Sequence, residues 1–248
     1  MSFEIEGKAA LVTGANRGIG RAIVEALLER GARKVWAGTR SEGALADLRA
    51  AHPDRLEVLT LDVTREAEVE AAAARAGDVS LLVNNAGVAL HFGAPATDAE
   101  WLRAGREEVE VNLLGTLAVT QAFAPVLARN GGGAIVNIVS VAGLVNFPAF
   151  LSYSASKAAL HSLTQGLRVA LKGQGTQVFG VYPGPVDTEM AAKLTFEKTP
   201  ASDVARAILE GLAAGTEDIF PDPMAKQIGE AFLKSPKALE LRLGEQAA

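Results

Sequence analysis

The chain has 248 residues, of which 49% are apolar and 21% charged, and it carries a formal net charge of −5 and no cysteine. This balance provides no basic surface for a nucleic acid backbone or an anionic membrane, so we expect neither as a partner. A chain without cysteine has no disulfides, thiolate nucleophiles or cysteine metal sites. His52, His91 and His161 stand far apart, so we also expect no metal site.

The length fits one large domain or two small ones, and no Pro/Ser-rich linker divides the chain. We therefore expect a single domain over residues 1–248. The acidic N-terminus has only a short apolar run, unlike a signal peptide. No stretch of about 20 apolar residues is present to span a bilayer. These features predict a cytoplasmic protein.

Apolar runs of strand length alternate with segments of helical periodicity along the chain. The strand-like runs are residues 8–13, 33–38, 56–61, 80–84, 134–139 and 177–182, with 217–221 as a weaker seventh. The helical segments are residues 18–30, 42–51, 65–76, about 98–129, 152–172 and 201–214. This alternation predicts an α/β fold, a Rossmann-type doubly wound parallel sheet of about seven strands with helices on both faces.

The segment TGANRGIG, residues 13–20, follows the first strand and opens the first helix. Gly14, Gly18 and Gly20 can supply a tight turn, close backbone approach to a pyrophosphate and close packing of helix on strand. The helix N-terminus adds free N–H groups, so we expect an anion there. The glycine spacing differs from G-x-G-x-x-G, and three glycines also fit a plain strand-to-helix turn.

The end of the second strand bears on the choice of cofactor. An NAD site usually places an acid there against the ribose 2′-hydroxyl, whereas this chain has Gly38, Thr39 and Arg40. A 2′-phosphate accepts a forked, charge-assisted contact from an arginine, and Arg17 of the glycine loop is a possible second cation. NADP(H) is therefore favoured over NAD(H). The alternative is that both arginines are solvated loop residues.

Five more blocks fall at the later carboxyl ends of the sheet. They are NNAG (84–87), EVNLLGT (110–116), NIVSVAG (137–143), YSASK (153–157) and YPGPVDT (182–188). In this order, over roughly residues 5–190, the sequence closely resembles the short-chain dehydrogenase/reductase family, which binds nicotinamide cofactors. The resemblance implies an oxidoreductase that transfers hydride between NADPH and a ketone or aldehyde, and oxidises alcohols in reverse.

The resemblance implies Asn112, Ser140, Tyr153 and Lys157 as the catalytic residues, although each taken singly also fits an ordinary structural role. Tyr153 and Lys157 lie four residues apart on a predicted helix, hence on one face. A nearby ammonium favours phenolate, so we expect Lys157 to lower the pKa of Tyr153, the general acid and base. Ser140 is expected to bond the substrate carbonyl. Asn112 is expected to hold a proton-relaying water.

The resemblance also implies the cofactor-binding residues. They are Gly14, Asn16, Arg17, Gly18, Ile19 and Gly20 of the first loop, Thr39 and Arg40 after the second strand, Asp62 and Val63 beside the adenine, Asn85, Ala86 and Gly87 along the groove, Tyr153 and Lys157, and Pro183, Gly184, Val186 and Thr188 around the nicotinamide.

The substrate pocket is expected between Ser140 and Tyr153 and on the neighbouring loops. The candidates are Val141, Val145 and Phe150, then Leu144 and Phe147, and further Leu90, Phe92, Tyr182 and Met190. Mostly apolar walls suit a small uncharged carbonyl compound or alcohol.

After Thr188 the chain departs from the common form of the family. Residues 189–199 predict a short substrate loop, and the apolar spacing within residues 222–248 predicts two short amphipathic helices that pack on this subunit or on a neighbour. We expect a homo-oligomer, either a dimer or a tetramer. The alternatives to an active NADPH reductase are an NAD-using dehydrogenase of the same family and a catalytically silent NADP-binding sensor or scaffold.

Overall fold

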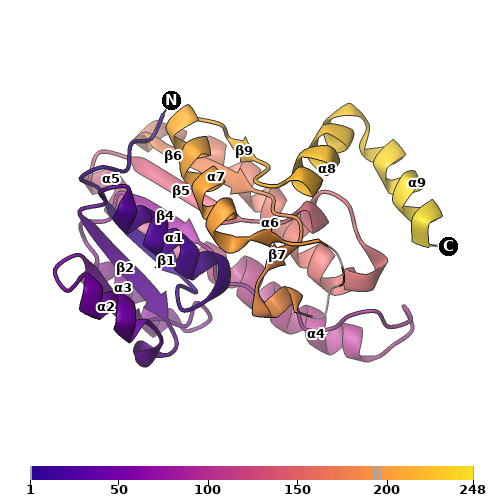
Figure 1. Cartoon of the computed structure of the whole chain (residues 1–248), viewed down its shortest axis with the longest axis horizontal. Coiled ribbons are helices and arrows are strands. Elements are labelled where there is room, and N and C mark those ends of the chain that lie inside the picture. Colours follow the sequence, from indigo (N-terminus) through magenta and orange to yellow (C-terminus); the bar gives the residue numbers. More distant parts are fainter. Residues whose placement is uncertain (1, 193–194, 196, 248) are drawn as a thin grey trace.

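The computed structural model describes residues 2–192, 195 and 197–247. Seven parallel strands form one sheet in the order β3-β2-β1-β4-β5-β6-β9 (Figure 1). Their bounds are β1 Ala9–Thr13, β2 Lys34–Thr39, β3 Leu56–Thr60, β4 Leu81–Asn84, β5 Gly133–Ile138, β6 Thr176–Val181 and β9 Asp218–Ile219. The predicted fold class is confirmed, including the weak last strand. The order reverses next to β1, where such sheets place their ligands.

Helices cover both faces of the sheet because every central strand is apolar on both sides. On one face α1 (Gly18–Glu29) packs against α7 (Ala201–Ala214), and their buried residues join one core cluster. On the other face α3 (Glu66–Arg75) packs against α5 (Thr116–Arg129). The remaining helices that precede the C-terminal segment are α2 Ala46–Ala51, α4 Glu100–Val109 and α6 Leu151–Ala170.

Helices α4 and α5 run on through a π-helical turn at Glu110–Gly115. A Cβ on Gly115 would lie 2.6 Å from Cγ2 of Val63, so the turn brings the helix close to the loop after β3. The run from 100 to 129 is long and apolar enough in composition to cross a membrane. Here Val119 and Phe123 of this run are fully buried in the core of the fold.

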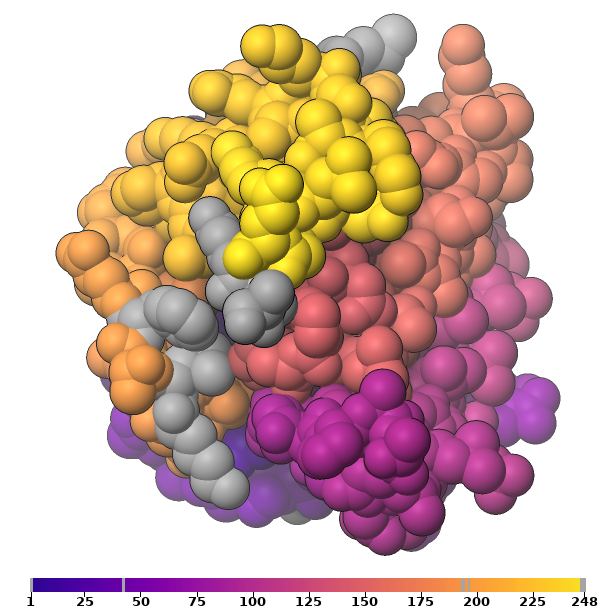
Figure 2. Space-filling view, turned by 90° about the vertical axis from the view of Figure 1, so that its right-hand side faces the viewer, coloured from indigo at the N-terminus to yellow at the C-terminus, as the bar shows by residue number. Residues whose placement is uncertain are grey.

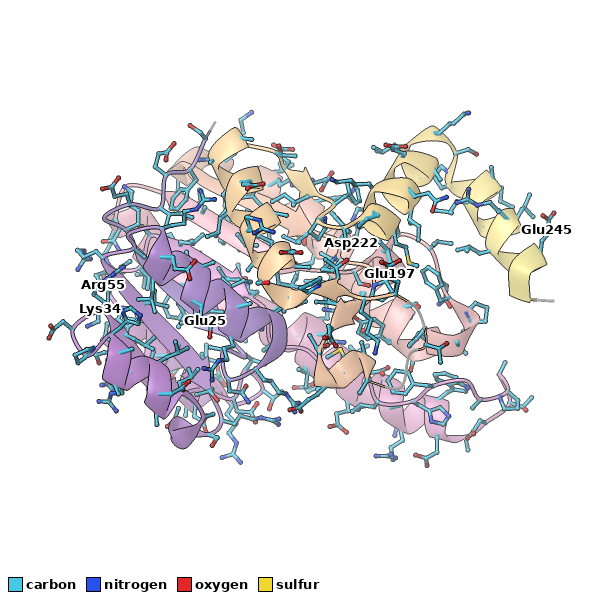
Figure 3. The ribbon with its side chains drawn as sticks, in the orientation of Figure 1. Glu25, Lys34, Arg55, Glu197, Asp222 and Glu245 are labelled. Carbon is cyan, nitrogen blue, oxygen red and sulfur yellow. The ribbon has the colours of Figure 1, made fainter. Side chains whose placement is uncertain are left out.

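The C-terminal segment forms two helices, α8 (Pro223–Lys234) and α9 (Pro236–Ala247), as its apolar spacing predicted. Figure 1 shows them beyond one end of the sheet. Asp222 starts α8, because its Oδ1 accepts the Ala225 N–H at 2.8 Å while its Oδ2 accepts the Gly184 N–H at 2.7 Å. Figure 3 labels Asp222 at the base of α8, far from Glu245 near the end of α9. One carboxylate thus joins this hairpin to the loop after β6.

A second, two-stranded sheet pairs β7 (Val186–Asp187) with β8 (Thr199–Pro200), and a short 3-10 turn at Glu189–Ala191 lies between them. These elements bracket the predicted substrate loop 189–199. Residues 193, 194 and 196 of that loop lie outside the described residues.

Candidate active site

A cavity of about 1020 Å³ opens at the carboxyl ends of the central strands. Ser140, Tyr153 and Lys157 line it, and so does every predicted cofactor residue except Gly20. Gly20, Asn112 and Val145 do not line it, and neither do Leu90, Leu144 and Tyr182 among the further substrate candidates. The structure therefore brings together side chains and backbone from blocks that are spread over residues 14–188 of the sequence.

The glycine loop is tied to the end of β4 by hydrogen bonds. Oγ1 of Thr13 accepts the N–H groups of Asn85 and Ala86, both at 3.0 Å. Gly14 has φ of 62°, and a Cβ there would lie 2.9 Å from Cα of Ala86. A Cβ on Gly20 would lie 2.3 Å from the carbonyl oxygen of Gly14, so Gly20 permits close packing and does not line the cavity. Both glycines are required by the close approach of these segments.

Helix α1 begins at Gly18, which has φ of 54°, and its first turn receives no side-chain cap from the described residues. Its leading N–H groups are therefore available to an anion at the cavity wall. Arg17, just before this helix, forms an ion pair with Glu189 of the predicted substrate loop. The expected second cation is thus paired with a carboxylate, and both side chains are exposed.

Arg40 and Asp62 lie at the end of the cavity formed by the strands β2 and β3. Burial opposes ionisation of Asp62, but hydrogen bonds from the backbone and side chain of Thr64 and the positive charge of Arg40 outweigh it. The pKa of Asp62 therefore lies below its ordinary value. Arg40 itself is exposed and carries its charge at the mouth of this end of the cavity.

Tyr153 and Lys157 lie one turn apart on α6, as predicted. The Lys157 side chain is buried, and its Nζ donates to the carbonyl oxygen of Ile138 at 2.8 Å and lies 5.8 Å from the centre of the Tyr153 ring. Burial lowers the pKa of Lys157 to about 7. The buried amine is therefore only partly charged near neutrality.

The expected lowering of the Tyr153 pKa is not what the protein produces. Burial raises the pKa of Tyr153 to about 12, a hydrogen bond with Ser140 opposes this rise, and the negative charge of Glu108 adds to it. The sequence places Lys157 beside the phenol but does not reveal how strongly both groups are desolvated. The phenol accordingly keeps its proton at neutral pH, the form a proton donor needs.

Ser140 lies two residues after the end of β5 and lines the cavity with its hydroxyl held in place. Its Oγ accepts the Ala142 N–H at 3.1 Å and donates to the carbonyl oxygen of Pro183 at 3.4 Å. The second of these bonds is long, so the hydroxyl proton is only weakly engaged. Ser140 is therefore placed to donate to an acceptor in the cavity, beside the phenol of Tyr153.

Asn112 lies in the π-helical turn and is fully buried. Its Oδ1 accepts the Val88 N–H at 2.8 Å, and its Nδ2 donates to the carbonyl oxygen of Val88 and to Oγ of Ser156, both at 2.9 Å. One amide hydrogen thus holds the loop after β4, and the other is donated to α6. A Cβ on Gly87 would lie 3.1 Å from Oδ1 of Asn112 and 3.5 Å from Nζ of Lys157, so these two side chains flank Gly87.

Glu108 is a residue of this region that the sequence analysis missed. It lies one helical turn before Asn112 and is fully buried, and its Oε1 accepts the Leu90 N–H at 2.8 Å. Its Oε2 has no hydrogen-bond partner within the described part of the chain. Glu108 and Asn112 together hold the loop after β4 from one helix face. The four-residue spacing between Glu108 and Asn112 was the signal that could have revealed this role. The acidic residues around Glu108 instead suggest a solvated helix surface.

The substrate candidates divide between the cavity and the core. Val141 and Phe150 line the cavity, and Phe150 meets Phe92 edge to face with ring centres 5.4 Å apart. Phe147 and Met190 line it as well. These side chains form the apolar wall that the sequence predicted.

Val145 is buried among the C-terminal helices, in a cluster with Leu239 and Ile228. Tyr182 is buried in the same cluster, and its hydroxyl bonds Nδ1 of His161 at 2.8 Å and Oδ1 of Asp218 at 3.1 Å. Both candidates therefore support the wall from behind. Leu90 and Leu144 also lie outside the lining.

The C-terminal helices supply a part of the cavity wall that the sequence analysis missed. Met224, Gln227 and Ile228 of α8 and Arg242 and Leu243 of α9 line the cavity. Figure 2 shows the C-terminal residues in yellow above the segment that carries residues 140–160, with the region near residue 100 below. No motif in residues 222–248 signals this position, because it depends on how the hairpin folds back.

No group of three or more His, Cys, Asp or Glu side chains suited to a metal ion is found among residues 2–192, 195 and 197–247. The titratable side chains that line the cavity include Tyr153 and Lys157 and the carboxylates of Asp62, Glu107 and Glu189.

The sequence model of the short chain dehydrogenase family matches residues 8–199. An uncharacterised oxidoreductase of Staphylococcus saprophyticus is 35% identical over 84% of this chain and 92% of its own length. A galactitol 2-dehydrogenase of Cereibacter sphaeroides is 39% identical over 77% of this chain and 76% of the relative.

Solved structures of short chain dehydrogenases match this chain over nearly its whole length. A short chain dehydrogenase of Burkholderia cenocepacia in complex with NADP has a TM-score of 0.90 and 41% identity, covering 97% of this chain and 99% of the other. A short chain dehydrogenase/reductase of Burkholderia phymatum in complex with NAD has a TM-score of 0.82 and 30% identity, covering 97% and 96%. The chain therefore belongs to the short chain dehydrogenase family of oxidoreductases.

Proposed function

We propose that the protein is an NADP-dependent oxidoreductase that transfers hydride between NADPH and a ketone or aldehyde. The observation that carries the proposal is that Ser140, Tyr153 and Lys157 share one cavity with the glycine loop. The glycine turns and the uncapped start of α1 fit a pyrophosphate, so the residues present suit a dinucleotide. The bound nicotinamide would supply the hydride.

In this proposal the protein's own groups manage the proton and the charge on oxygen. Tyr153 gives its phenolic proton to the carbonyl oxygen, which suits a phenol that burial keeps protonated. Ser140 donates a hydrogen bond to the same oxygen as negative charge develops. Lys157, partly charged near neutrality, stabilises the phenolate that remains. Asn112 keeps the neighbouring loop in place.

The preference for NADP rests on the charge at the end of β2. Arg40 lines the cavity where an NAD site usually has an acid, and the Burkholderia cenocepacia relative was solved with NADP. The relative solved with NAD has lower identity to this chain. We further propose a cytoplasmic homo-oligomer, a dimer or tetramer, which the exposed Leu102 and Leu114 on the α4 side favour.

The cofactor proposal is tested by steady-state oxidation of NADPH and of NADH with a panel of small ketones and aldehydes. We expect a higher kcat/KM with NADPH, and we expect Arg40→Gln to raise the KM for NADPH by about tenfold because a charge-assisted contact is lost. Arg49→Gln is the matched control, since Arg49 is exposed on α2 away from the cavity. Equal or better use of NADH by the wild type would contradict the proposal.

A further inference from the structure

Arg242 is a cation of the active-site cavity that the proposed reaction does not use. It lies on α9 three residues after Leu239, which is only 1% exposed, and one residue before Leu243, which also lines the cavity. Residues three and four apart share a helix face, so Leu243 packs beside Leu239, while the exposed Arg242 next to it lines the cavity. The position of Arg242 is thus set by a packed helix.

The other cations of the cavity already have acceptors or charged neighbours. Arg17 is paired with Glu189, Nζ of Lys157 donates to a backbone carbonyl, and Arg40 lies near Asp62 at the opposite end. Arg242 makes no ion pair and no hydrogen bond with any described residue. Glu107 of α4 also lines the cavity but lies beyond ion-pair distance of Arg242.

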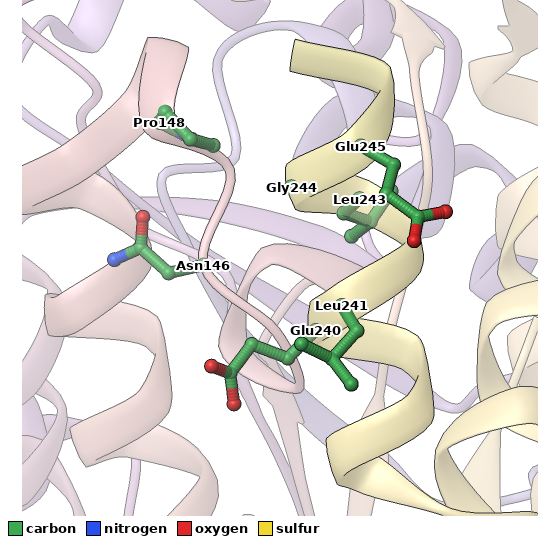
Figure 4. Close-up of a pocket in the computed structure, with 7 residues that line it drawn as sticks. All are labelled: Asn146, Pro148, Glu240, Leu241, Leu243, Gly244 and Glu245. Carbon is green, nitrogen blue, oxygen red and sulfur yellow. The ribbon is translucent and has the colours of Figure 1, made fainter. Parts of the chain in front are cut away.

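The carboxylates of α9 do not line this cavity. Glu240 and Glu245 line a neighbouring groove of about 540 Å³, together with Asn146 and Pro148 (Figure 4). Glu240 is also bonded to Lys237 at 2.6 Å. Leu243 and Pro148 line both spaces, so the groove adjoins the cavity, and neither carboxylate forms an ion pair with Arg242.

We infer that Arg242 binds a carboxylate of the substrate, so that the substrate is a ketone or aldehyde with a carboxylate remote from the carbonyl. Apolar side chains of α8 and of the wall around Phe150 lie in the same cavity as Tyr153 and Arg242, which suits an aliphatic or aryl spacer. A single guanidinium matches one carboxylate, whereas a phosphate would call for more positive charge. The inference rests on the proposed function and differs from the sequence-based expectation of an uncharged substrate.

The test separates binding from turnover. Tyr153→Phe enzyme loaded with NADPH is titrated calorimetrically with short oxo-carboxylates of increasing length and with their methyl esters. We expect the best acid to bind at least about tenfold more tightly than its ester, as a charge-assisted pair should provide. Adding Arg242→Gln should bring the ratio of acid affinity to ester affinity close to one. Arg242→Lys should keep part of the preference for the acid.

Lys226→Gln is the matched control, because Lys226 is exposed on α8 and does not line the cavity. This variant should keep the acid-to-ester ratio. An acid-to-ester affinity ratio near one in the Tyr153→Phe enzyme with Arg242 intact would overturn the inference. So would an equal loss of affinity for acid and ester on Arg242→Gln. Turnover of the same compounds by wild-type enzyme tests the reaction separately. Acid binding that depends on Arg242 without any oxidation of NADPH would sink the proposed reductase and leave the carboxylate site standing.

Discussion

Two regions of the molecule meet at one cavity but are held in different ways. The first, which we call the shared region, runs from β1 to the loop after β6, and the second is the α8–α9 hairpin. In the first region the cavity wall is fixed by many short backbone and side-chain hydrogen bonds, such as those of Thr13 and Asn112. The hairpin is held by Asp222 and by apolar packing around Leu239. The family match ends at residue 199, before the hairpin. We therefore propose that the chemistry lies in the shared region and that the hairpin contributes to substrate selectivity.

The largest effect is expected in the shared region from Tyr153→Phe. Loss of the phenolic proton should reduce kcat by about two to four orders of magnitude, as removal of a general acid does. The affinity for NADPH, measured by its fluorescence, should stay unchanged because the ring remains. A variant that keeps its kcat would remove the acid–base role of Tyr153.

A second change in the same region links catalysis to pH. We expect Lys157→Met to lose most activity and yet to be more stable than the wild type at pH 6, since burying the amine costs free energy. The folded pKa of about 7 lies below the ordinary 10.5. Between these values the unfolded chain binds a proton that the folded protein has released, so wild-type stability rises with pH.

Methionine does not titrate, so the stability advantage of Lys157→Met should be largest below pH 7 and shrink towards about pH 10.5. Urea unfolding at a series of pH values measures this difference. An advantage that stays constant with pH would mean that the lysine is charged in the folded protein at every pH tested.

The smallest effect on the chemical step is expected in the hairpin. Leu239→Ala removes a buried side chain and should lower the free energy of unfolding by about 2–5 kcal/mol. The KM for the carbonyl substrate should rise while the affinity for NADPH stays near the wild-type value. Leu233→Ala is the control, because Leu233 is 75% exposed and should cost little. An equal loss of NADPH affinity in Leu239→Ala would mean that the two regions are not separable.

The fold was predictable because strand and helix periods alternate clearly, and even the two-residue β9 was anticipated. The sequence blocks NIVSVAG and YSASK indicated that Ser140, Tyr153 and Lys157 lie together, and all three residues line one cavity. The sequence could not assign Val145 to the core or Arg242 to the cavity, because both placements depend on how the hairpin packs back on the loop after β5. It also could not weigh burial against charge, and so the pKa direction of Tyr153 was wrong.

Asp222 has a consequence for protein engineering. Its side chain is 2% exposed and satisfies one amide in the loop after β6 and one in α8. A chimera that receives its C-terminal hairpin from a relative must keep this carboxylate at the junction. A graft without it would leave both N–H groups without their acceptor, and the buried one, of Ala225, would cost roughly 1–3 kcal/mol. Exchange of hairpins as cassettes is therefore best begun just after residue 222, so that Asp222 is kept.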